Sequence, residues 1–565
     1  MGAGAMWGHD TSVALFIDDE LVFAAEDERF TRVKHGDGTY PREAVLACFD
    51  YADIDAGSLD RVILTADPKL TRRRFGAMVE HHLHDDNGPL RKLYGLKNRL
   101  ENMAELRFLQ ESRVRRRIEE LAEGEASFDV VARSHHRCHA ASAFYPTDFE
   151  EALVVTLDGR GEYDATVVWH GTPDGVERVR TYEYPNSLGN FFAVVTAFLG
   201  YRPNNGEGKV MGLAPYGKRD PDIERGLRAF VETGVEYDTT DLTTGPDHAG
   251  VERLESRFGR DRHDPDEPFD QWEKNFAHTA QRLLEETVLD IVEQYAERLG
   301  TGNVCLAGGV ALNCKMNKRV RASPAVDELF VQPVAHDGGL AIGAGMLEST
   351  PAETDPWDGA DIYLGPAYDT DDVVAMLERN KIEYETPDDL ERTVAEELAD
   401  GRLVGWFRGR TELGPRALGA RSILADPRSE ASRDRVNRHV KHREEWRPFA
   451  PSMLAEAADE YLVDASEAPY MIQTFDVAPE KRDEVAAVIH PGDDTTRPQT
   501  VSEAANPRYY RLIEAFADIT GVPAVLNTSF NDHGEPIVNT PEEALVDFYR
   551  MGLDTLVLED AVVRK

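Results

Sequence analysis

The chain has 565 residues, of which 41% are hydrophobic and 30% charged, so it is long enough for about two to four folded domains and is no disordered tail. Its net charge of −41 argues against a nucleic-acid partner, and no apolar run approaches the roughly 20 residues that span a bilayer. The four cysteines form no CxxC pair, which argues against thiolate zinc. We therefore expect a cytoplasmic protein with no membrane segment.

The acidic residues are spread through the sequence rather than gathered in one block. A block would indicate an interaction tail, whereas acid on every predicted surface helix is typical of a halophilic protein, because concentrated salt screens the self-repulsion. In a chain adapted to high salt, the large negative net charge would mask a modest basic patch, so the net charge is weaker evidence against a nucleic-acid partner. Arginines do cluster at residues 72–74 and 113–117, and we interpret both clusters as solvated helix faces.

The first region, residues 1–350, opens with MWGHDTSVALFIDDELVFAAEDERFTRVKH, whose apolar alternation around a DD turn predicts a β-hairpin. A charged, mostly helical stretch near residues 70–125 looks like an insertion. Two strands, at residues 154–157 and 165–169, then precede a long helical pattern near residues 275–299. The strand–turn–helix sequence NVCLAGGVALNCKMN follows, and this alternation of strands with helices predicts an α/β fold.

Two histidines lie four residues apart in the run SHHRCHAASAF. His135 and His139 project from the same face of a helix, so both could bind one metal ion. Asp158, after a predicted strand, and Asp337, in VQPVAHDGG, are candidate oxygen ligands, and such a set suits Fe(II), Mn(II) or Zn(II). His136 also shares a face with His139, and a His pair that binds no metal is a further alternative. The residues alone do not decide whether His135 or His136 pairs with His139, or whether such a pair binds a metal.

Glycine-rich loops follow some of the predicted strands. Gly308 and Gly309 lie between a strand and a helix in LAGGVALN, where the backbone can approach a phosphate or a sugar closely. The run NNGEGKVMGLAPYG lacks the spacing of a P-loop, which argues against a Walker nucleotide fold. Three acidic turns, at Asp10, Asp158 and Asp337, instead resemble the actin-like ATPase architecture, in which two lobes clamp a nucleotide and a metal.

The stretch at residues 351–365 is rich in Pro, Asp and Gly, so we expect a linker there and a separate C-terminal domain at residues 366–565. That domain concentrates arginines beside Gly, Pro and Trp. Planar guanidinium groups bind phosphate or carbamate oxygens bidentately, which predicts an anion pocket, whereas ion pairs with acids would explain only one or two of these arginines. The candidates are Arg416, Arg421, Lys441, Arg443, Arg447, Arg497, Asn527, Thr528, Ser529 and Asn531.

The chain contains, in this order, the motifs HHRCHAASAFYP, LDGRGE, GKVMGLAPYG, AGGVALN, ELGPRALGARSILADPR, REEWRPFAPSML and LNTSFN. Together they resemble the O-carbamoyltransferase family of antibiotic-tailoring enzymes, of the tobramycin and cephamycin type, and nodulation enzymes. The resemblance implies a two-lobed actin-like (ASKHA) N-terminal domain and an α/β C-terminal domain similar to threonylcarbamoyl-adenylate synthases. It also implies that the C-terminal domain makes carbamoyl-adenylate from carbamoyl phosphate and ATP with Mg(II). The N-terminal domain would then transfer the carbamoyl group to a hydroxyl of a small molecule or glycan.

The resemblance also implies roles for individual residues. The implied metal ligands are His135, His139, Asp158 and Asp337, and the implied ion is Fe(II), with Mn or Zn as alternatives. His9 and Asp10 are further catalytic candidates. His9 is a candidate base or phosphate contact, although a hydrogen-bonded turn histidine is an equal alternative. The implied contacts to ATP and carbamoyl phosphate are Gly308, Gly309, Asn313, Lys441, Arg447, Arg497, Asn527 and Ser529. Arg416 lies nearby and is a catalytic candidate, as are Lys441 and Arg447.

Two rival classes remain at this point. A fused tRNA threonylcarbamoyl-adenosine-type enzyme would need a basic RNA groove, which the arginine-rich insertion could supply, but REEWRPFAP points to hydroxyl carbamoylation. A silent actin-like regulatory ATPase is disfavoured by the presence of all four candidate metal ligands. We also expect that the chain can form a homodimer.

Overall fold

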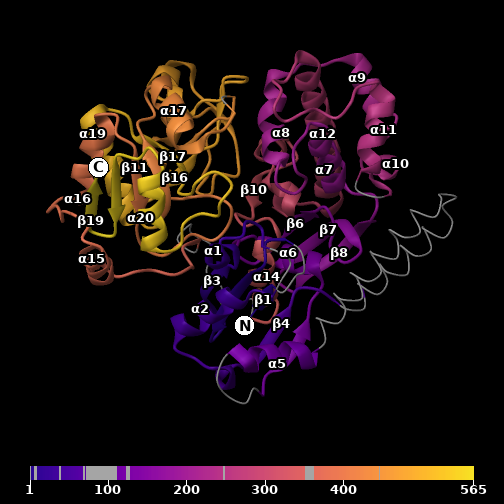
Figure 1. Ribbon diagram of the computed structural model, residues 1–565. Helices are drawn as coiled ribbons and strands as arrows, with labels where there is room; N and C mark the ends of the chain where they lie inside the picture. Colours follow the sequence, from indigo (N-terminus) through magenta and orange to yellow (C-terminus); the bar gives the residue numbers. More distant parts are fainter. Residues whose placement is uncertain are drawn as a thin grey trace. The chain divides into compact units, whose positions relative to one another are not determined.

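The computed structural model (Figure 1) has a mixed α/β fold and describes residues 2–4, 9–36, 40–67, 70, 111–121, 127–245, 248–349, 362–444 and 446–565. The first of its two compact units contains Met1–Asp27 and His35–Pro356, and the second contains Glu28–Lys34 and Trp357–Lys565. The segment Glu28–Lys34 thus belongs with the C-terminal half, although it lies within residues 1–350, the expected first domain. Most of the expected linker and insertion lies outside the described residues, and α5 (Glu111–Leu121) is the described helix of the insertion.

The first sheet of the first unit has the strand order β3-β2-β1-β4-β5. Strands β1 to β3 are antiparallel, and β4 and β5 continue the sheet in parallel with β1. The predicted hairpin is confirmed, because Asp18 and Asp19 join β2 to β3 with φ of 50° and 67°, which suits a tight two-residue turn. The strands are β1 (Gly2–Gly4), β2 (Ser12–Ile17), β3 (Glu20–Glu26), β4 (Arg61–Leu64) and β5 (Asp129–Ala132).

The second sheet repeats this topology with the order β8-β7-β6-β9-β10. Three antiparallel strands are again followed by two parallel ones, although the sequence contains no recognisable repeat. Strand β6 is buried along its whole length, as expected for a central strand covered on both faces. The strands are β6 (Ala152–Leu157), β7 (Asp164–Thr172), β8 (Gly175–Glu183), β9 (Asn303–Ala307) and β10 (Glu328–Val331).

Helices cover both sheets of the first unit. Helix α2 (Arg42–Ala52) packs on β2 and β3, and α6 (His135–Phe144) packs on β6 and β9 as well as on α14 (Leu340–Met346). The long predicted helix is confirmed as α12 (Gln271–Leu299), which begins at a capping box formed by Asp270 and Glu273. Around α12 lie α7 (Leu188–Phe198), α8 (Glu207–Leu213), α9 (Pro221–Leu227) and α13 (Cys314–Arg321), and α11 (Ala249–Phe258) packs on α7 (Figure 1).

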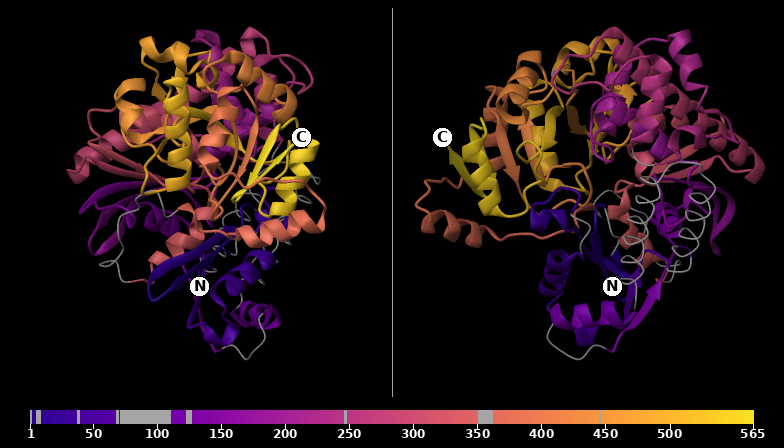
Figure 2. Two further views of the ribbon diagram at one scale, coloured as in Figure 1. Left: turned by 90° about the vertical axis from the view of Figure 1, so that its left-hand side faces the viewer. Right: turned by 45° about the vertical axis from the view of Figure 1, so that its right-hand side comes forward.

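The second unit is built on a seven-stranded mixed sheet with the order β16-β13-β17-β12-β11-β18-β19. Its apolar core includes Trp406, Tyr509 and Phe516 and lies between the sheet and its helices. The C-terminal strand forms one edge of the sheet (Figure 2). The strands are β11 (Val404–Phe407), β12 (Arg421–Ala425), β13 (Ala450–Leu454), β16 (Gln499–Val501), β17 (Ala524–Ser529), β18 (Thr555–Leu558) and β19 (Ala561–Arg564). The helices include α1 (Glu28–Thr31), α15 (Thr370–Arg379), α16 (Leu390–Ala399), α17 (Glu430–Val436), α18 (Ala458–Tyr461), α19 (Pro507–Thr520) and α20 (Pro541–Arg550).

No helix in the described part of the chain combines the length and the apolar character that crossing a membrane requires.

Candidate functional site

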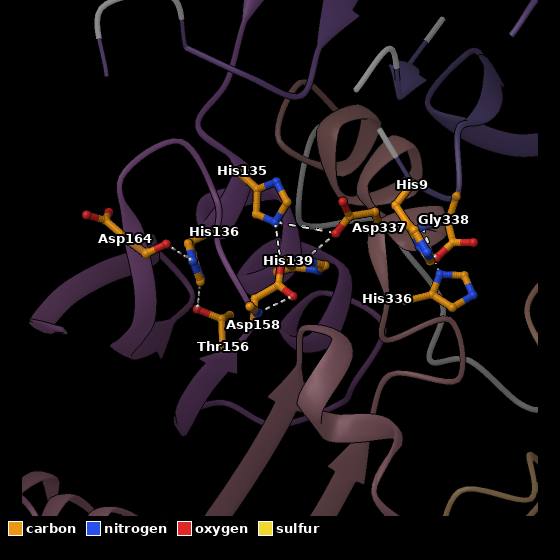
Figure 3. A network of polar contacts seen from close by, with 12 residues as sticks. His9, His135, His136, His139, Thr156, Asp158, Asp164, His336, Asp337 and Gly338 are labelled. Carbon is orange, nitrogen blue, oxygen red and sulfur yellow. Dashed lines mark hydrogen bonds and ion pairs between the residues drawn. The ribbon is translucent and has the colours of Figure 1, made fainter. Parts of the chain in front are cut away.

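Four candidate metal ligands converge in the first unit (Figure 3). His135 and His139 lie in the first turns of α6, Asp158 follows β6, and Asp337 begins a short 3-10 turn before α14. Asp158 Oδ2 lies 2.8 Å from His135 Nε2 and 3.8 Å from His139 Nε2. Asp337 Oδ1 lies 3.5 Å and 3.7 Å from the same two nitrogens. All four residues offer a donor atom within 4.8 Å of the others.

Two close backbone approaches help to bring these ligands together. Gly308, with φ of 89°, directly follows β9, and a Cβ there would lie only 2.1 Å from the Leu157 carbonyl oxygen at the end of β6. A Cβ on Gly343 of α14 would lie 1.9 Å from the Cys138 carbonyl oxygen of α6. Only glycine fits at either position, so the turn after β9 reaches the end of β6 and α14 packs closely on α6.

The electrostatics of the cluster favour a bound cation. Burial by itself lowers the pKa of His135, but the charge of Asp337 and the hydrogen bond and charge of Asp158 outweigh burial and raise that pKa to about 9. Burial by itself raises the pKa of Asp158, but the two histidines hold it well below its ordinary value. Within the described residues, neither ring nitrogen of the buried His139 has a hydrogen-bond partner. Two imidazoles and two carboxylates arranged in this way fit a divalent transition ion.

His136 points away from the cluster (Figure 3). Its Nδ1 lies 2.9 Å from the Thr156 hydroxyl, and its Nε2 lies 3.0 Å from the Asp164 carbonyl oxygen. Burial and the neighbouring His135 hold the pKa of His136 well below its ordinary value, so the ring is neutral. Both nitrogens are therefore used in packing the helix on the sheet, and His136 serves a structural role.

A second polar cluster surrounds His9 in the same unit. The Asp10 carboxylate lies 2.6 Å from His9 Nδ1 and 2.8 Å from His35 Nδ1, and the two rings stack with centroids 4.4 Å apart. Burial by itself lowers the pKa of His9, but the hydrogen bond and charge of Asp10, with the charges of Asp337 and Glu207, raise it overall. The contact to Asp10 places a proton on Nδ1 of neutral His9 and leaves Nε2 as the acceptor.

The glycine turn and Asn313 lie at the end of the second sheet. A Cβ on Gly309 would lie 3.3 Å from Asp158 Oδ1, so this glycine is beside a candidate metal ligand. The Asn313 amide accepts a hydrogen bond from the Met316 backbone N–H at the start of α13 and exchanges two hydrogen bonds of 2.9 Å with Gln281. The side chain of Asn313 is therefore engaged in capping the helix. The backbone of Gly308 and Gly309 is a better candidate than Asn313 for a contact with a nucleotide.

Lys441 is the centre of the polar site in the second unit. It ends a π-helical turn, Asn437–Lys441, that continues α17, and its side chain is buried. Its ammonium donates to the Ser529 carbonyl oxygen at 2.6 Å, the Ser529 hydroxyl at 3.2 Å, and the Asn531 backbone and side-chain oxygens at 3.1 and 2.8 Å. Burial lowers the pKa of Lys441 well below its ordinary value, and the nearby charges of Arg443, Lys34 and Arg447 lower it further.

Several arginines lie close to Lys441. Arg443 packs over the Phe449 ring with its guanidinium 4.1 Å from the ring centroid and donates to the Pro448 carbonyl oxygen. Burial lowers the pKa of Arg443 well below its ordinary value, and Arg447 and Arg497 lower it further. The charges of these cations act on one another, and Glu444, 3.5 Å from Arg447, offsets them in part, so an anion would relieve the remaining repulsion.

Asn527 connects the sheet to the loop that carries Arg416. Its Nδ2 donates to the Ala417 carbonyl oxygen at 3.1 Å and to the Ser452 hydroxyl at 2.9 Å. Arg416 itself is half-buried in the loop between β11 and β12. Arg421 differs from the other candidates, because its guanidinium stacks 3.6 Å over the Phe407 ring and donates to the backbone carbonyl oxygens of residues 366, 408 and 420. We therefore assign Arg421, the first residue of β12, a structural role rather than a place in an anion pocket.

Comparison with known proteins identifies the family. Residues 1–346 match the carbamoyltransferase N-terminus family, and residues 395–565 match the carbamoyltransferase C-terminus family. The chain belongs to the carbamoyltransferase family. It is 36% identical to nodulation protein NolNO of Sinorhizobium fredii, over 99% of this chain and 79% of that protein. It is 28% identical to the 3'-hydroxymethylcephem-O-carbamoyltransferase of Amycolatopsis lactamdurans, over 76% of this chain and 79% of that enzyme.

These matches confirm the family and the enzyme class that the motifs predicted. Among solved structures, component A of (R)-2-hydroxyglutaryl-CoA dehydratase from Acidaminococcus fermentans aligns with a TM-score of 0.33 at 15% identity, over 60% of this chain and 93% of that one. That score is too low to support an inference about this carbamoyltransferase.

Sequence reasoning missed His35 in this carbamoyltransferase. No local pattern links positions 10 and 35, and the two come together because the Asp10 backbone N–H donates to the His35 carbonyl oxygen at 3.0 Å. Both residues have positive φ, 56° and 64°, so the contact depends on two unusual backbone conformations. Such conformations at non-glycine positions are not readable from composition or periodicity.

Proposed function

We propose that this carbamoyltransferase is an ATP-dependent O-carbamoyltransferase that works in two steps. The second unit makes carbamoyl-adenylate from carbamoyl phosphate and ATP, with Mg(II) on the triphosphate. The first unit transfers the carbamoyl group to a hydroxyl of a small molecule or glycan. The observation that carries the proposal is the gathering of Lys441, Arg443, Arg447 and Arg497 in a chain whose net charge is −41.

The cation cluster suits adenylate formation. In this step water first cleaves carbamoyl phosphate to carbamate and inorganic phosphate. A carbamate oxygen then attacks the α-phosphorus of ATP, and pyrophosphate leaves. The reactants carry several negative charges and repel one another. Fixed cations are therefore needed to hold them in the geometry for attack. Lys441 and Arg447 would hold the phosphates, while Arg416, Arg497, Asn527 and Ser529 would complete the pocket. A shielded site also keeps the mixed anhydride from water.

The first unit supplies groups for the transfer step. Its two sheets of identical topology support the expected actin-like architecture of two related lobes. His135, His139, Asp158 and Asp337 would hold a divalent ion, Fe(II) by resemblance with Mn or Zn as alternatives. That ion would polarise the carbamoyl oxygen as a Lewis acid.

His9 is our candidate general base for the acceptor hydroxyl. The hydrogen bond from Nδ1 to Asp10 orients the ring and leaves Nε2 to accept a proton. The charge of Asp10 stabilises the imidazolium that forms, which is consistent with the raised pKa of His9. Backbone N–H groups at Gly308 and Gly309 would contact the adenylate phosphate beside Asp158.

The test is isotope exchange between pyrophosphate and ATP in the presence of carbamoyl phosphate. We expect exchange in the parent enzyme and at least a hundredfold loss in Arg447→Ala, whereas Arg511→Ala, which removes an exposed arginine of the same unit, should exchange normally. A parent enzyme that carbamoylates an acceptor without any exchange would exclude an adenylate intermediate. A small-molecule extract fraction and total tRNA, supplied separately, would identify the class of acceptor.

A further inference from the structure

The segment Glu28–Lys34 belongs to the second unit although it lies between two elements of the first unit in the sequence. Arg29, in the short helix α1, is only 3% exposed, and its guanidinium donates to the Gly414 carbonyl oxygen, 385 residues away in the sequence. Such burial of an arginine is uncommon unless the guanidinium has specific partners. Gly414 has φ of 97° and lies two residues before Arg416, so this contact holds the loop that carries a candidate phosphate-binding residue.

Arg32 holds a second loop of the same unit. Its guanidinium donates to the carbonyl oxygens of Ile537 at 2.6 Å and Pro536 at 2.9 Å. It also lies 3.5 Å from Glu543, whose carboxylate caps the start of α20. A planar guanidinium can satisfy two adjacent carbonyl groups at once, which a lysine ammonium does less well.

The loop held by Arg32 leads directly to Lys441. Asn531 donates from Nδ2 to the Glu535 carbonyl oxygen at 2.6 Å, next to the two carbonyl groups that Arg32 holds. The other end of the same amide, Oδ1, accepts from the Lys441 ammonium at 2.8 Å. A displacement of residues 535–537 would therefore move the amide that positions Lys441.

The backbone of the segment is also unusual. Arg32 has φ of 59°, in the left-handed region that a side chain disfavours. A strained conformation persists only where the surrounding contacts outweigh its cost, and such positions are common at functional sites. Here the conformation places the Arg32 guanidinium against the loop after β17.

We infer that Arg29 and Arg32 are positioning residues of the carbamoyl-adenylate site, although they lie in the N-terminal part of the chain. The chemistry of that site rests on the proposed function. Arg29 holds the loop of Arg416, and Arg32 holds the loop of Asn531 and Lys441. The C-terminal half of the chain therefore depends on two arginines near the N-terminus to arrange its own phosphate-binding groups.

The experiment uses the full-length enzyme and the pyrophosphate–ATP exchange reaction. In Arg32→Ala we expect kcat/KM for carbamoyl phosphate to fall at least tenfold, with KM rising, while the metal content and the unfolding temperature of the first unit match the parent. Millimolar methylguanidinium should restore part of the lost exchange. The kcat/KM of Arg32→Lys should lie between the values of the parent and Arg32→Ala, because a single ammonium replaces the two N–H groups with which the guanidinium binds adjacent carbonyl oxygens. Arg42→Ala, which removes an exposed arginine of α2, is the matched control and should behave as the parent in every assay.

Parent values of KM and kcat in both Arg32→Ala and Arg29→Lys would overturn the inference. A lower unfolding temperature with unchanged KM and no rescue by methylguanidinium would also overturn it, since that result assigns the arginines to stability alone. If Arg32→Ala does not fold, Arg32→Lys decides by the same KM comparison. Absence of exchange in the parent enzyme would instead contradict the proposed function, so the two failures are distinguishable.

Discussion

Replacement of Lys441 by methionine would test the phosphate site most directly. The substitution nearly keeps the length of the side chain of a residue that is 6% exposed, but removes the ammonium that donates to four oxygen atoms. All four oxygens are uncharged, so these contacts satisfy the donors without neutralising the charge. The charge of Asp547 acts on this ammonium from outside the set of hydrogen-bond partners, and an anionic substrate would add negative charge at the site.

The structure indicates the size of the effect. Loss of a buried, charged hydrogen-bonding partner costs about 2 to 5 kcal/mol, which corresponds to a fall of about 30-fold to several thousand-fold in kcat/KM for carbamoyl phosphate. The effect on folding should be smaller, because two changes oppose each other. Four acceptors lose a hydrogen-bond donor, but the cost of burying the ammonium is removed as well. We therefore expect Lys441→Met to fold as the parent does.

The same substitution should change the pH dependence of stability. Burial and the cations Arg443, Lys34 and Arg447 lower the pKa of Lys441 in the folded chain, whereas an unfolded lysine has a pKa of about 10.4. Between these two pKa values the unfolded chain binds more protons, so the stability of the parent should rise with pH across that alkaline window. Lys441→Met should lack this contribution.

Two measurements check these expectations: pyrophosphate–ATP exchange, and denaturant unfolding at several pH values from neutral to alkaline. Lys381→Met, which removes an exposed lysine of the same unit, is the control and should match the parent in both. Parent-like exchange in Lys441→Met would place the phosphate site elsewhere. An unchanged slope of stability with pH would refute the charge argument.

Three further predictions concern other parts of the molecule. His139→Ala should reduce the content of divalent transition metal from about one ion per chain to near zero without affecting pyrophosphate–ATP exchange, and equal metal content by elemental analysis would contradict the assigned cluster. Burial and Glu535 raise the pKa of Asp547 to about 6, so the stability that its protonation contributes is present below pH 4 and is lost as the pH rises through 6. Asp547→Asn should then raise the free energy of unfolding by about 1 to 2 kcal/mol at pH 7 and have little effect at pH 4, as denaturant titrations would show. Carbamoyl transfer to a small hydroxylated acceptor should persist in molar potassium chloride, whereas transfer to tRNA that weakens steeply with salt would favour the RNA-modifying alternative.

The sequence by itself determined the local elements of this protein and the types of residue that can carry its chemistry. Alternation of apolar residues around Asp18 and Asp19 predicted the first hairpin, and the 3.6-residue period predicted α12. Both signals are local, because the residues that create them are neighbours along the strand or the helix. The ordered motifs were sufficient to predict the family.

Only the tertiary structure decided which of these residues meet. His135 and His136 each share a helix face with His139, but the hydrogen bonds of His136 with the Thr156 hydroxyl and the Asp164 carbonyl oxygen separate the roles of His135 and His136. Arg416 and Arg421 look alike in their motif, yet one belongs to a half-buried loop and the other stacks on Phe407 inside the fold.

The contact of His35 with Asp10, and the contacts of Arg29 and Arg32 with distant loops of their own unit, depend on backbone turns of positive φ and on partners up to 505 residues away. Periodicity in the sequence describes how a residue relates to its own helix or strand. It carries no information on which loop of another element packs against it, and that packing assembled the polar clusters of both units.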